Sequence, residues 1–379
     1  MLHSMLVCLA LLSVLTVQAA LPPVKLGMSA PLSGVTIRLG QDYQAGAQLV
    51  FDRINQQGGI AGHPLQLICL DDGYNPLRTV ANTKSLLFEH QVTALFGYIG
   101  TPTSNAVLPM LRQLQMPYLA TFSGADLLRQ PQDQFIFNFR ASYAQEAAAQ
   151  IHYLVDQQQL RRIALLIQAD EFGATVEQHF LQQLQQRGIT PVLTSRFARN
   201  TADVSKVVAE LQQAAPELVL TVGTYPVLNK VIQSASQQGF TPVFSVVSFT
   251  GVSELAKLLP AGSQVLASMV VPDPATDQSQ LSQAYRTAAL AAGQQANDVG
   301  LEAFAAASLL VQALQSCVPE LRRDCVLHQL PRQQLFDFPL QYDAQRHQAS
   351  QQIYLVRLTA KRLLPIQPPA PLSQPQPQS

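Results

Sequence analysis

The stretch Ala94–Leu128, ALFGYIGTPTSNAVLPMLRQLQMPYLATFSGADLL, carries the pattern that decides the fold of this 379-residue chain. It predicts a buried strand over 94–99, a loop rich in hydroxyl groups over 100–105, a helix, a second strand over 117–120, and a second hydroxyl-rich loop over 121–124 that opens another helix. Two parallel strands need a crossover helix between them. This βαβ unit therefore predicts a parallel sheet with both loops at its carboxyl edge, where open α/β sheets bind ligands.

The two hydroxyl-rich loops share a further property, because each runs into a predicted helix N-terminus. Unpaired backbone N–H groups and the helix dipole favour an anion at such a position. The segments Gly100–Ser104 (GTPTS) and Thr121–Gly124 (TFSG) therefore predict the two halves of a cradle for a carboxylate. The alternative is that both are only N-caps, which need no ligand.

The composition indicates a globular protein of two lobes. The chain is longer than a single core usually holds, and 47% of its residues are hydrophobic. Lys and Arg together number 24, as do Asp and Glu, which gives a formal net charge of zero. Nucleic acid partners favour a basic face, so this balance argues against them.

The rest of the chain continues the alternation of strands and helices. A second run between residues 162 and 247 predicts another βαβ domain, so the fold class is α/β. A helix over about 299–315 is rich in Ala and Leu and should be buried. Two alternating stretches, 336–342 and 352–358, predict an antiparallel pair that closes the fold. Pro109 lies inside the first crossover helix, which we expect to start late or to kink.

Both ends of the chain differ in composition from the rest. Residues 1–20 contain a short apolar run followed by small residues, which predicts a cleaved signal peptide and a periplasmic location. No other segment is apolar enough over a sufficient length to cross a membrane. Residues 362–379 are rich in Pro and Gln and predict a disordered tail.

Three cysteines remain once Cys8 is removed with the signal peptide. Cys317 and Cys325 lie on either side of a proline and a charged turn, and we expect them to form a disulfide bond in an oxidising compartment. Cys69 lies in a predicted strand. A buried thiol is favoured there over the alternative, a catalytic nucleophile.

The sequence lacks the patterns of common catalytic and metal sites. Its seven histidines are scattered without the spacing of a zinc-binding helix, and no G-x-S-x-G motif occurs. Asp71 and Asp72 follow a predicted strand and could form a carboxylate pair for acid–base work or for a metal, unless they are structural. We expect no enzyme activity, no catalytic residue, no metal and no cofactor.

Three segments together resemble the leucine/isoleucine/valine class of type I periplasmic solute-binding proteins. They are VKLGMSAPLSG (24–34), FDRINQQGGIAGHPLQLICLDDGYNP (51–76) and LFGYIGTPTS (95–104). The resemblance covers roughly residues 24–358. It implies two Rossmann-like lobes that close on a small ligand, and it favours a structural role for Asp71 and Asp72.

The same resemblance implies a division of the chain into lobes. Lobe 1 would contain residues 21–140 and 271–334, and lobe 2 would contain residues 141–270 and 335–361. Three crossover segments, near Arg140, Val271 and Leu335, would join the lobes. Closure of a hinge by a few such residues agrees with the general behaviour of two-lobed proteins.

The family's ligand contacts are carried over by position. Thr101 matches the first hydroxyl contact to a ligand carboxylate, and Phe122–Gly124 match the next loop, where Gly124 replaces a threonine and Ser123 supplies the hydroxyl instead. Phe172 and Tyr225 match an aromatic wall. The expected ligand-binding residues are Thr101, Thr103, Ser104, Phe122, Ser123, Gly124, Phe172, Tyr225, Thr250 and Arg38. For Arg38 the alternative is an ordinary solvated arginine.

One departure from the family concerns the ligand's amine. Amino-acid binders of this class hold the ammonium with an acidic residue before a glycine, whereas this chain has Ser248-Phe249-Thr250-Gly251 there. An unpaired ammonium in a closed cleft costs several kcal/mol. We therefore expect a ligand with a carboxylate, amide or carbonyl group and without a charged amine.

Three functions are compatible with these observations. The first is a monomeric periplasmic protein that delivers a small solute to an inner-membrane ABC permease. The second is a sensor of the same fold that regulates a membrane kinase or cyclase, and the third is a periplasmic enzyme. The first two functions both need only a ligand that binds the closed state more tightly than the open state, so this property does not distinguish them.

Overall fold

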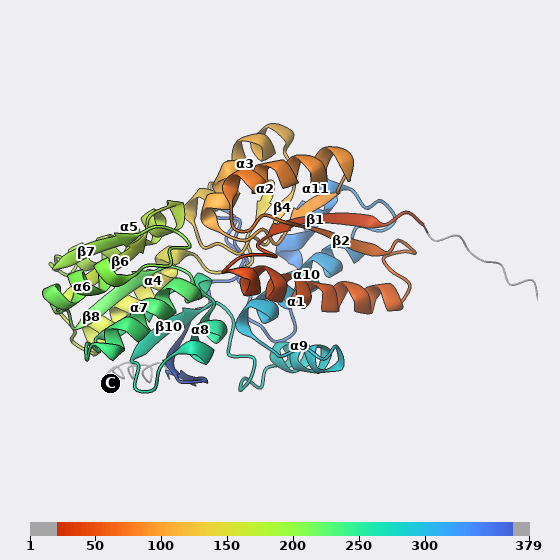
Figure 1. Cartoon of the computed structure of the whole chain (residues 1–379). Coiled ribbons are helices and arrows are strands. Elements are labelled where there is room, and N and C mark those ends of the chain that lie inside the picture. The colour runs from red at the N-terminus through yellow and green to blue at the C-terminus, as the bar shows by residue number, and fades with distance from the viewer. Residues whose placement is uncertain (1–20, 367–379) are drawn as a thin grey trace, which may run out of the picture.

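The computed structural model describes residues 21–366 and contains two β-sheets with helices packed on them (Figure 1). The first sheet has the strand order β2-β1-β3-β4-β5, and all neighbouring pairs are parallel. Its strands are β1 (Val24–Ala30), β2 (Leu65–Asp71), β3 (Ala94–Phe96), β4 (Tyr118–Leu119) and β5 (Ile136–Phe137). The predicted βαβ unit is confirmed, because β3 and β4 are adjacent and parallel.

We call the first sheet with its helices lobe 1. These helices are α1 (Ile37–Gln56), α2 (Pro76–Lys84), α3 (Thr101–Leu114), α9 (Gln280–Ala291), α10 (Asp298–Gln315) and α11 (Arg323–Gln329), with a π-helical turn at Ser85–Glu89 and a 3-10 turn, η2, at Asp126–Leu128. Helix α10 is buried along most of its length, as predicted, and lies beside α1 (Figure 1). A Cβ at Gly46 would lie 2.1 Å from the carbonyl oxygen of Gly300, so the two helix backbones touch at that point.

The second sheet with its helices forms lobe 2. Its strand order is β12-β11-β10-β9-β8-β6-β7, parallel from β10 to β7 and antiparallel at β11 and β12. The strands are β6 (Ile163–Gln168), β7 (Leu193–Phe197), β8 (Leu218–Val222), β9 (Val243–Val246), β10 (Val265–Met269), β11 (Tyr354–Thr359) and β12 (Arg362–Pro365). The helices are α4 (Tyr143–Ile151), α5 (Glu171–Gln185), α6 (Ser205–Ala214), α7 (Tyr225–Gln237) and α8 (Val252–Leu258), with shorter turns at His152–Gln157 and Ser248–Thr250. A further turn, Leu330–Arg332, lies against α10 and α11 of lobe 1.

The chain passes between the two lobes three times. It leaves the first sheet after β5, returns after β10 to place α9, α10 and α11 on lobe 1, and then leaves again to add β11 and β12 to lobe 2. The crossovers expected near Arg140, Val271 and Leu335 lie close to these passages. Each passage connects elements of different sheets and can therefore act as part of a hinge.

The predicted strand over 336–342 is wrong. These residues form no strand, and their apolar side chains pack on the first passage instead of joining a ladder. Phe338 stacks on Phe139 with 5.7 Å between ring centroids, and Tyr342 stacks on Phe137 at 6.1 Å. The later strand of the expected pair exists as β11, but its antiparallel neighbours are β10 and β12.

The prediction of a disordered tail over 362–379 is wrong at its start. Arg362–Pro365 form strand β12, which pairs antiparallel with β11 after a tight turn that holds Lys361 at a φ of 69°. Proline is tolerated here because β12 is an edge strand. Residues 367–379 and the expected signal peptide, 1–20, lie outside the described residues.

The two hydroxyl-rich loops differ in detail from the prediction. Helix α3 begins at Thr101 and contains Pro109. Of the two alternatives expected for it, the late start is wrong, and the kink at Pro109 stays a prediction. The GTPTS hydroxyl groups belong to the first turn of α3. The second loop opens only the three-residue turn η2 and not a helix. The second half of the cradle therefore has no helix dipole behind it.

The expected disulfide bond between Cys317 and Cys325 is present, with 5.9 Å between the two Cα atoms. It ties the end of α10 to α11. Cys69 is a free, half-buried thiol on β2, and burial raises its pKa to about 12. A thiol that stays protonated at neutral pH is a poor nucleophile. Among the described helices, none has the length and apolar character that a membrane span requires.

Candidate functional site

The two hydroxyl-rich segments meet at the carboxyl edge of the first sheet, where lobe 1 faces lobe 2. Thr101 lies in the first turn of α3 and Ser123 follows β4, and their hydroxyl oxygens are 2.9 Å apart. Both side chains are fully buried. The sequence therefore placed these two hydroxyl groups together correctly, because adjacent parallel strands bring their following loops to one edge.

Tyr143 adds a third hydroxyl group to this edge. It begins α4 in lobe 2, and its backbone N–H donates to the carbonyl oxygen of Gly124 over 2.8 Å. A Cβ at Gly124 would lie 2.6 Å from the Tyr143 ring, so the threonine that the family has at this position would not fit here. Burial raises the pKa of Tyr143 to about 12, which keeps the phenol neutral. Sequence reasoning did not select Tyr143.

Two of the predicted site residues point elsewhere. The Thr103 hydroxyl donates to the backbone carbonyl oxygens of Ile99 and Gly100, at 2.5 and 2.9 Å. The Ser104 hydroxyl accepts a hydrogen bond from the Tyr118 hydroxyl over 2.9 Å, on the far side of α3. Both therefore stabilise α3 and its packing on the sheet in this structure, and neither adds to the Thr101–Ser123 pair.

An aromatic cluster fills the interface beside this pair. Phe249 of lobe 2 packs against Phe172 of its own lobe, with ring centroids 4.6 Å apart, and against Phe122 and Tyr74 of lobe 1, at 5.4 and 6.0 Å. All four rings are almost completely buried. Phe122 and Phe172 were predicted, whereas Tyr74 and Phe249 were not. The lobes are closed on one another here, and the hydroxyl pair is shielded from solvent.

The remaining predicted residues, Tyr225, Thr250 and Arg38, bond to protein groups in this structure. The Tyr225 hydroxyl donates across the lobes to the carbonyl oxygen of Val35 over 3.1 Å. The Thr250 hydroxyl donates to the carbonyl oxygen of Gly223 within lobe 2. Arg38, whose side chain is 42% exposed, forms a 2.5 Å ion pair with Asp42.

Arg38 also lies 3.9 Å from Glu254 of α8. In this arrangement its charge is shared between one carboxylate from each lobe. That geometry makes Arg38 a bridge across the rim of the interface, and its role as a ligand contact stays a prediction.

A buried arginine that sequence reasoning missed lies behind Phe122. The Cζ atom of Arg140 is 4.4 Å from the Phe122 ring centroid, Nη2 donates to the Ser248 hydroxyl over 2.6 Å, and Nε is 3.2 Å from a carboxylate oxygen of Glu302. Arg140 is completely buried. Its partners come from the loop after β4, from lobe 2 and from α10 of lobe 1, so no local pattern could have identified them.

Glu146 completes this polar cluster in lobe 2. Its carboxylate accepts hydrogen bonds from the Ser248 backbone N–H and hydroxyl, at 2.7 and 2.8 Å, and from the Ser268 hydroxyl at 2.5 Å. The loop that carries an acid in amino-acid binders is thus used differently here. Its serine is a structural link between Arg140 and Glu146, and its next residue is Phe249.

A narrow gap separates the lobes at this cluster, and it has no room for a water molecule. Its lining residues are Phe122, Arg140, Ser248, Met269, Val270, Val271, Asp298 and Glu302. Burial raises the pKa of Glu302 to about 7, opposed by the positive charge of Arg140, and burial also raises the pKa of Asp298. The two acids belong to α10, one turn apart, and sequence reasoning did not select them.

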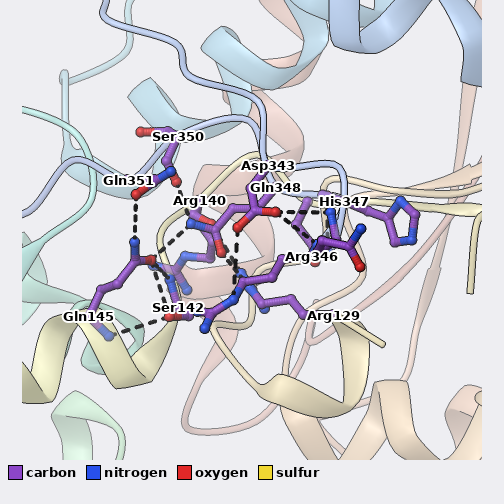
Figure 2. A network of polar contacts seen from close by, with 12 residues as sticks. Arg129, Arg140, Ser142, Gln145, Asp343, Arg346, His347, Gln348, Ser350 and Gln351 are labelled. Carbon is purple, nitrogen blue, oxygen red and sulfur yellow. Dashed lines mark hydrogen bonds and ion pairs between the residues drawn. The ribbon is translucent and has the colours of Figure 1, made fainter. Parts of the chain in front are cut away.

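The first and third passages between the lobes are joined by polar contacts, which Figure 2 shows. Arg129 donates from Nε to the side-chain oxygen of Gln348 over 2.9 Å and from Nη2 to the carbonyl oxygen of Arg140 over 3.0 Å. Gln348 in turn donates to the side-chain oxygen of Gln145 at the start of α4. A parallel bridge between Asn138 and Gln348 joins the two backbones. These contacts therefore link the two passages.

The acidic pair Asp71 and Asp72 is structural. Burial opposes the ionisation of Asp71, but hydrogen bonds, of which the one from Ser33 has the largest effect, lower its pKa to about 2. Burial raises the pKa of Asp72. Both carboxylates accept hydrogen bonds from the β1 region, Asp71 from Ser33 at 2.6 Å and Asp72 from Ser29 at 2.7 Å. Within residues 21–366, no group of three or more His, Cys, Asp or Glu side chains is arranged to hold a metal ion.

Two α/β lobes, joined by three passages and carrying paired hydroxyl loops where the lobes meet, define a protein built to close around a solute. The chain belongs to the periplasmic binding protein family, whose sequence model matches residues 23–362. This is a family of solute-binding proteins.

Curated relatives agree with this assignment over part of their length. The chain is 25% identical over 247 residues to Leu/Ile/Val-binding protein homolog 7 of Brucella abortus (strain 2308), and the match covers 61% of each chain. It is 23% identical to an amino acid binding protein of Pseudomonas aeruginosa, over 62% of this chain and 63% of that protein. The chain thus matches somewhat less than two thirds of the length of these relatives.

Solved structures match over nearly the whole chain. A possible leucine/isoleucine/valine-binding protein from Rhodopirellula baltica SH 1 is 31% identical with a TM-score of 0.85, and the match covers 92% of this chain and 97% of that one. The branched-chain amino acid transporter substrate-binding protein of Streptococcus pneumoniae, solved with isoleucine, is 15% identical with a TM-score of 0.80 over 91% of this chain and all of that chain. At 15% identity this second match establishes the fold alone.

Proposed function

We propose that this protein captures a small solute between its two lobes in the periplasm and delivers it, as a monomer, to the permease of an ABC importer. The lobes would contain residues 21–140 and 271–334, and residues 141–270 and 335–361. The observation that carries the proposal is the buried Thr101–Ser123 hydroxyl pair at the carboxyl edge of the first sheet, facing the aromatic wall of lobe 2.

The proposed ligand carries a carboxylate or amide group and an apolar body. Thr101 and Ser123 can turn their hydroxyl hydrogens from each other to a ligand oxygen, and the Tyr143 phenol is a neutral donor next to them. Phe122, Phe172 and Phe249 offer apolar surface to the rest of the molecule. Hydroxyl donors and a neutral phenol suit a carboxylate, an amide or a carbonyl group.

The proposed ligand has no charged amine. Phe249 stands in the loop that carries the ammonium-binding acid of amino-acid binders, and its ring is enclosed by other rings. The acids of α10 are already engaged, Asp298 by backbone N–H groups of α8 and Glu302 by Arg140. An ammonium group would therefore lose its hydration without gaining a carboxylate partner.

Binding requires the lobes to open, because the aromatic cluster occupies the interface in the closed arrangement. The linked passages at Arg140 and Gln348 provide the hinge. Opening separates Phe249 from Phe122 and Tyr74, and the solute takes the surface that Phe249 leaves. The closed form would be the one that an importer recognises.

A matched set of solutes tests the proposal. Mature protein, unfolded and refolded to remove co-purified solute, is screened by thermal shift with leucine, 4-methyl-2-oxopentanoate and 4-methylpentanamide. The two compounds without an amine should raise the melting temperature at millimolar concentration, and leucine should not. Stronger stabilisation by leucine than by either analogue would contradict the ligand class. If no solute in a panel that covers the ligands of the whole family changes the melting temperature, that result would contradict solute binding itself.

A further inference from the structure

Helix α8 of lobe 2 begins without a cap of its own. Its N-cap residue is Gly251, in a left-handed conformation with φ of 85°, and glycine has no side chain to accept from the first amide groups. The first N–H groups of a helix need acceptors when they are buried. Val252 at the helix start is fully buried, so its amide group cannot rely on water.

Asp298 of lobe 1 supplies the missing acceptors. One carboxylate oxygen accepts from the Val252 N–H over 3.3 Å and the other from the Ser253 N–H over 3.2 Å. The Asp298 N–H donates back to the Ser253 hydroxyl over 3.4 Å. These three contacts imitate a capping box, with the difference that the two helices belong to different lobes.

Asp298 is not needed to cap its own helix. The side chain of Asn297 caps α10 by accepting from the Gly300 N–H over 2.8 Å. Asp298 is only 6% exposed, and the amide groups of α8 are its hydrogen-bond partners in the described part of the chain. A buried carboxylate is stable only when it is hydrogen-bonded, so its position ties it to the closed arrangement.

The segment before α8 is pressed against lobe 1 at the same place. A Cβ at Gly251 would lie 2.8 Å from a methyl carbon of Leu39 on α1. Gly251 directly follows Phe249 and Thr250, which form the lobe 2 wall of the proposed site. Any change in the position of α8 therefore moves this wall.

We propose that Asp298 is a positioning residue that caps α8 only when the lobes are closed, and so links closure to the placement of the Phe249–Thr250 wall. Opening releases both partners to water. Closing restores the cap and, when no solute is bound, sets Phe249 against Phe122 and Tyr74. The inference rests on the proposed closing of the lobes, and it concerns a contact in which both partners, Asp298 and the amide groups of α8, are protein groups.

The test measures closure without a ligand. Mature protein freed of solute is studied by small-angle X-ray scattering, and the curve is fitted as a mixture of closed and open forms. Asp298→Ala should lower the ratio of closed to open molecules about fivefold, the scale of a lost helix cap. Asp298→Asn is the second variant, for use if the alanine variant does not fold. It keeps the shape of the side chain but presents an NH₂ group to one of the two amide groups of α8. It should lower the ratio of closed to open molecules by a smaller factor.

Asn75→Ala is the matched control. Asn75 accepts from the first N–H groups of α2, Leu77 at 2.9 Å and Arg78 at 3.4 Å, and cap and helix both belong to lobe 1. It should lower stability and leave the closed fraction unchanged. An unchanged closed fraction in the Asp298 variants, or an equal change in the Asn75 variant, would overturn the inference. Either result leaves solute binding in the thermal-shift panel intact, so it does not bear on the proposed function.

Discussion

Arg140 donates from Nη2 to the hydroxyl of Ser248 over 2.6 Å, and this bond joins the first passage between the lobes to the loop that carries Phe249. The same hydroxyl donates to Glu146. Ser248→Ala removes one bond from each of two buried charged groups. Loss of such hydrogen bonds costs about 1–3 kcal/mol, so the free energy of unfolding in urea should fall by that amount. Ser316→Ala, which removes an exposed hydroxyl just after α10, should leave this free energy nearly unchanged.

The Thr101–Ser123 pair predicts a loss of affinity when either hydroxyl is removed. Thr101→Ala and Ser123→Ala should each weaken binding of the best carboxylate from the solute panel by about 1–2 kcal/mol, the scale of one lost hydrogen bond. Isothermal titration calorimetry measures the change. Thr287→Ala, which removes an exposed hydroxyl bonded to Gln283, is the control. Unchanged affinity in both site variants would falsify the carboxylate cradle.

The neutral Phe249 wall predicts a switch of ligand class. Phe249→Glu places a carboxylate in the loop where the amino-acid binders of this family carry one, so thermal shifts should appear with leucine that are absent in the natural protein. Phe249→Gln has similar size without charge and should not respond to leucine. Because both variants lose a buried ring, their melting temperatures without solute are compared first. Equal responses of the two variants to leucine would count against the charge argument.

The raised pKa of Glu302 predicts a pH-dependent stability. Its folded pKa is about 7 against an ordinary 4.5, because burial disfavours the ionised form. The folded state therefore holds its proton more tightly than the unfolded state does, and the free energy of unfolding should fall as pH rises from about 4.5 to 7. In Glu302→Gln this part of the fall should disappear in urea titrations across that range. Exposed Glu320→Gln should keep the natural slope, and an unaltered slope in Glu302→Gln would contradict the assignment.

The part of the fold that was predictable from sequence follows from local periodicity. The stretch 94–128 gave a parallel βαβ unit because its strands and helix have distinct apolar periods, and topology then placed Thr101 beside Ser123. The prediction failed where an apolar alternation serves another purpose. In 336–342 it packs Tyr342 on Phe137 of β5 and Phe338 on Phe139 of the first passage, and it forms no strand ladder.

The unpredicted site residues depend on partners that are far apart in the sequence. Arg140 meets Ser248 and Glu302 across separations of more than one hundred residues, and no local pattern marks a buried arginine. The loop that contains Phe249 was noted from the sequence only because it lacks an acidic residue. Its packing on Phe122 and Tyr74 depends on how the lobes meet, which strand and helix periods do not encode.

The backbone contact between Gly46 and Gly300 affects how the molecule is assembled. Helix α1 is made among the first elements, whereas the helix that covers it, α10, is made after most strands of lobe 2. During synthesis the N-terminal lobe is thus completed late, and the face of α1 that α10 covers has no partner until α10 is made. Translocation of the whole chain before folding would let both helices be present when the lobe forms.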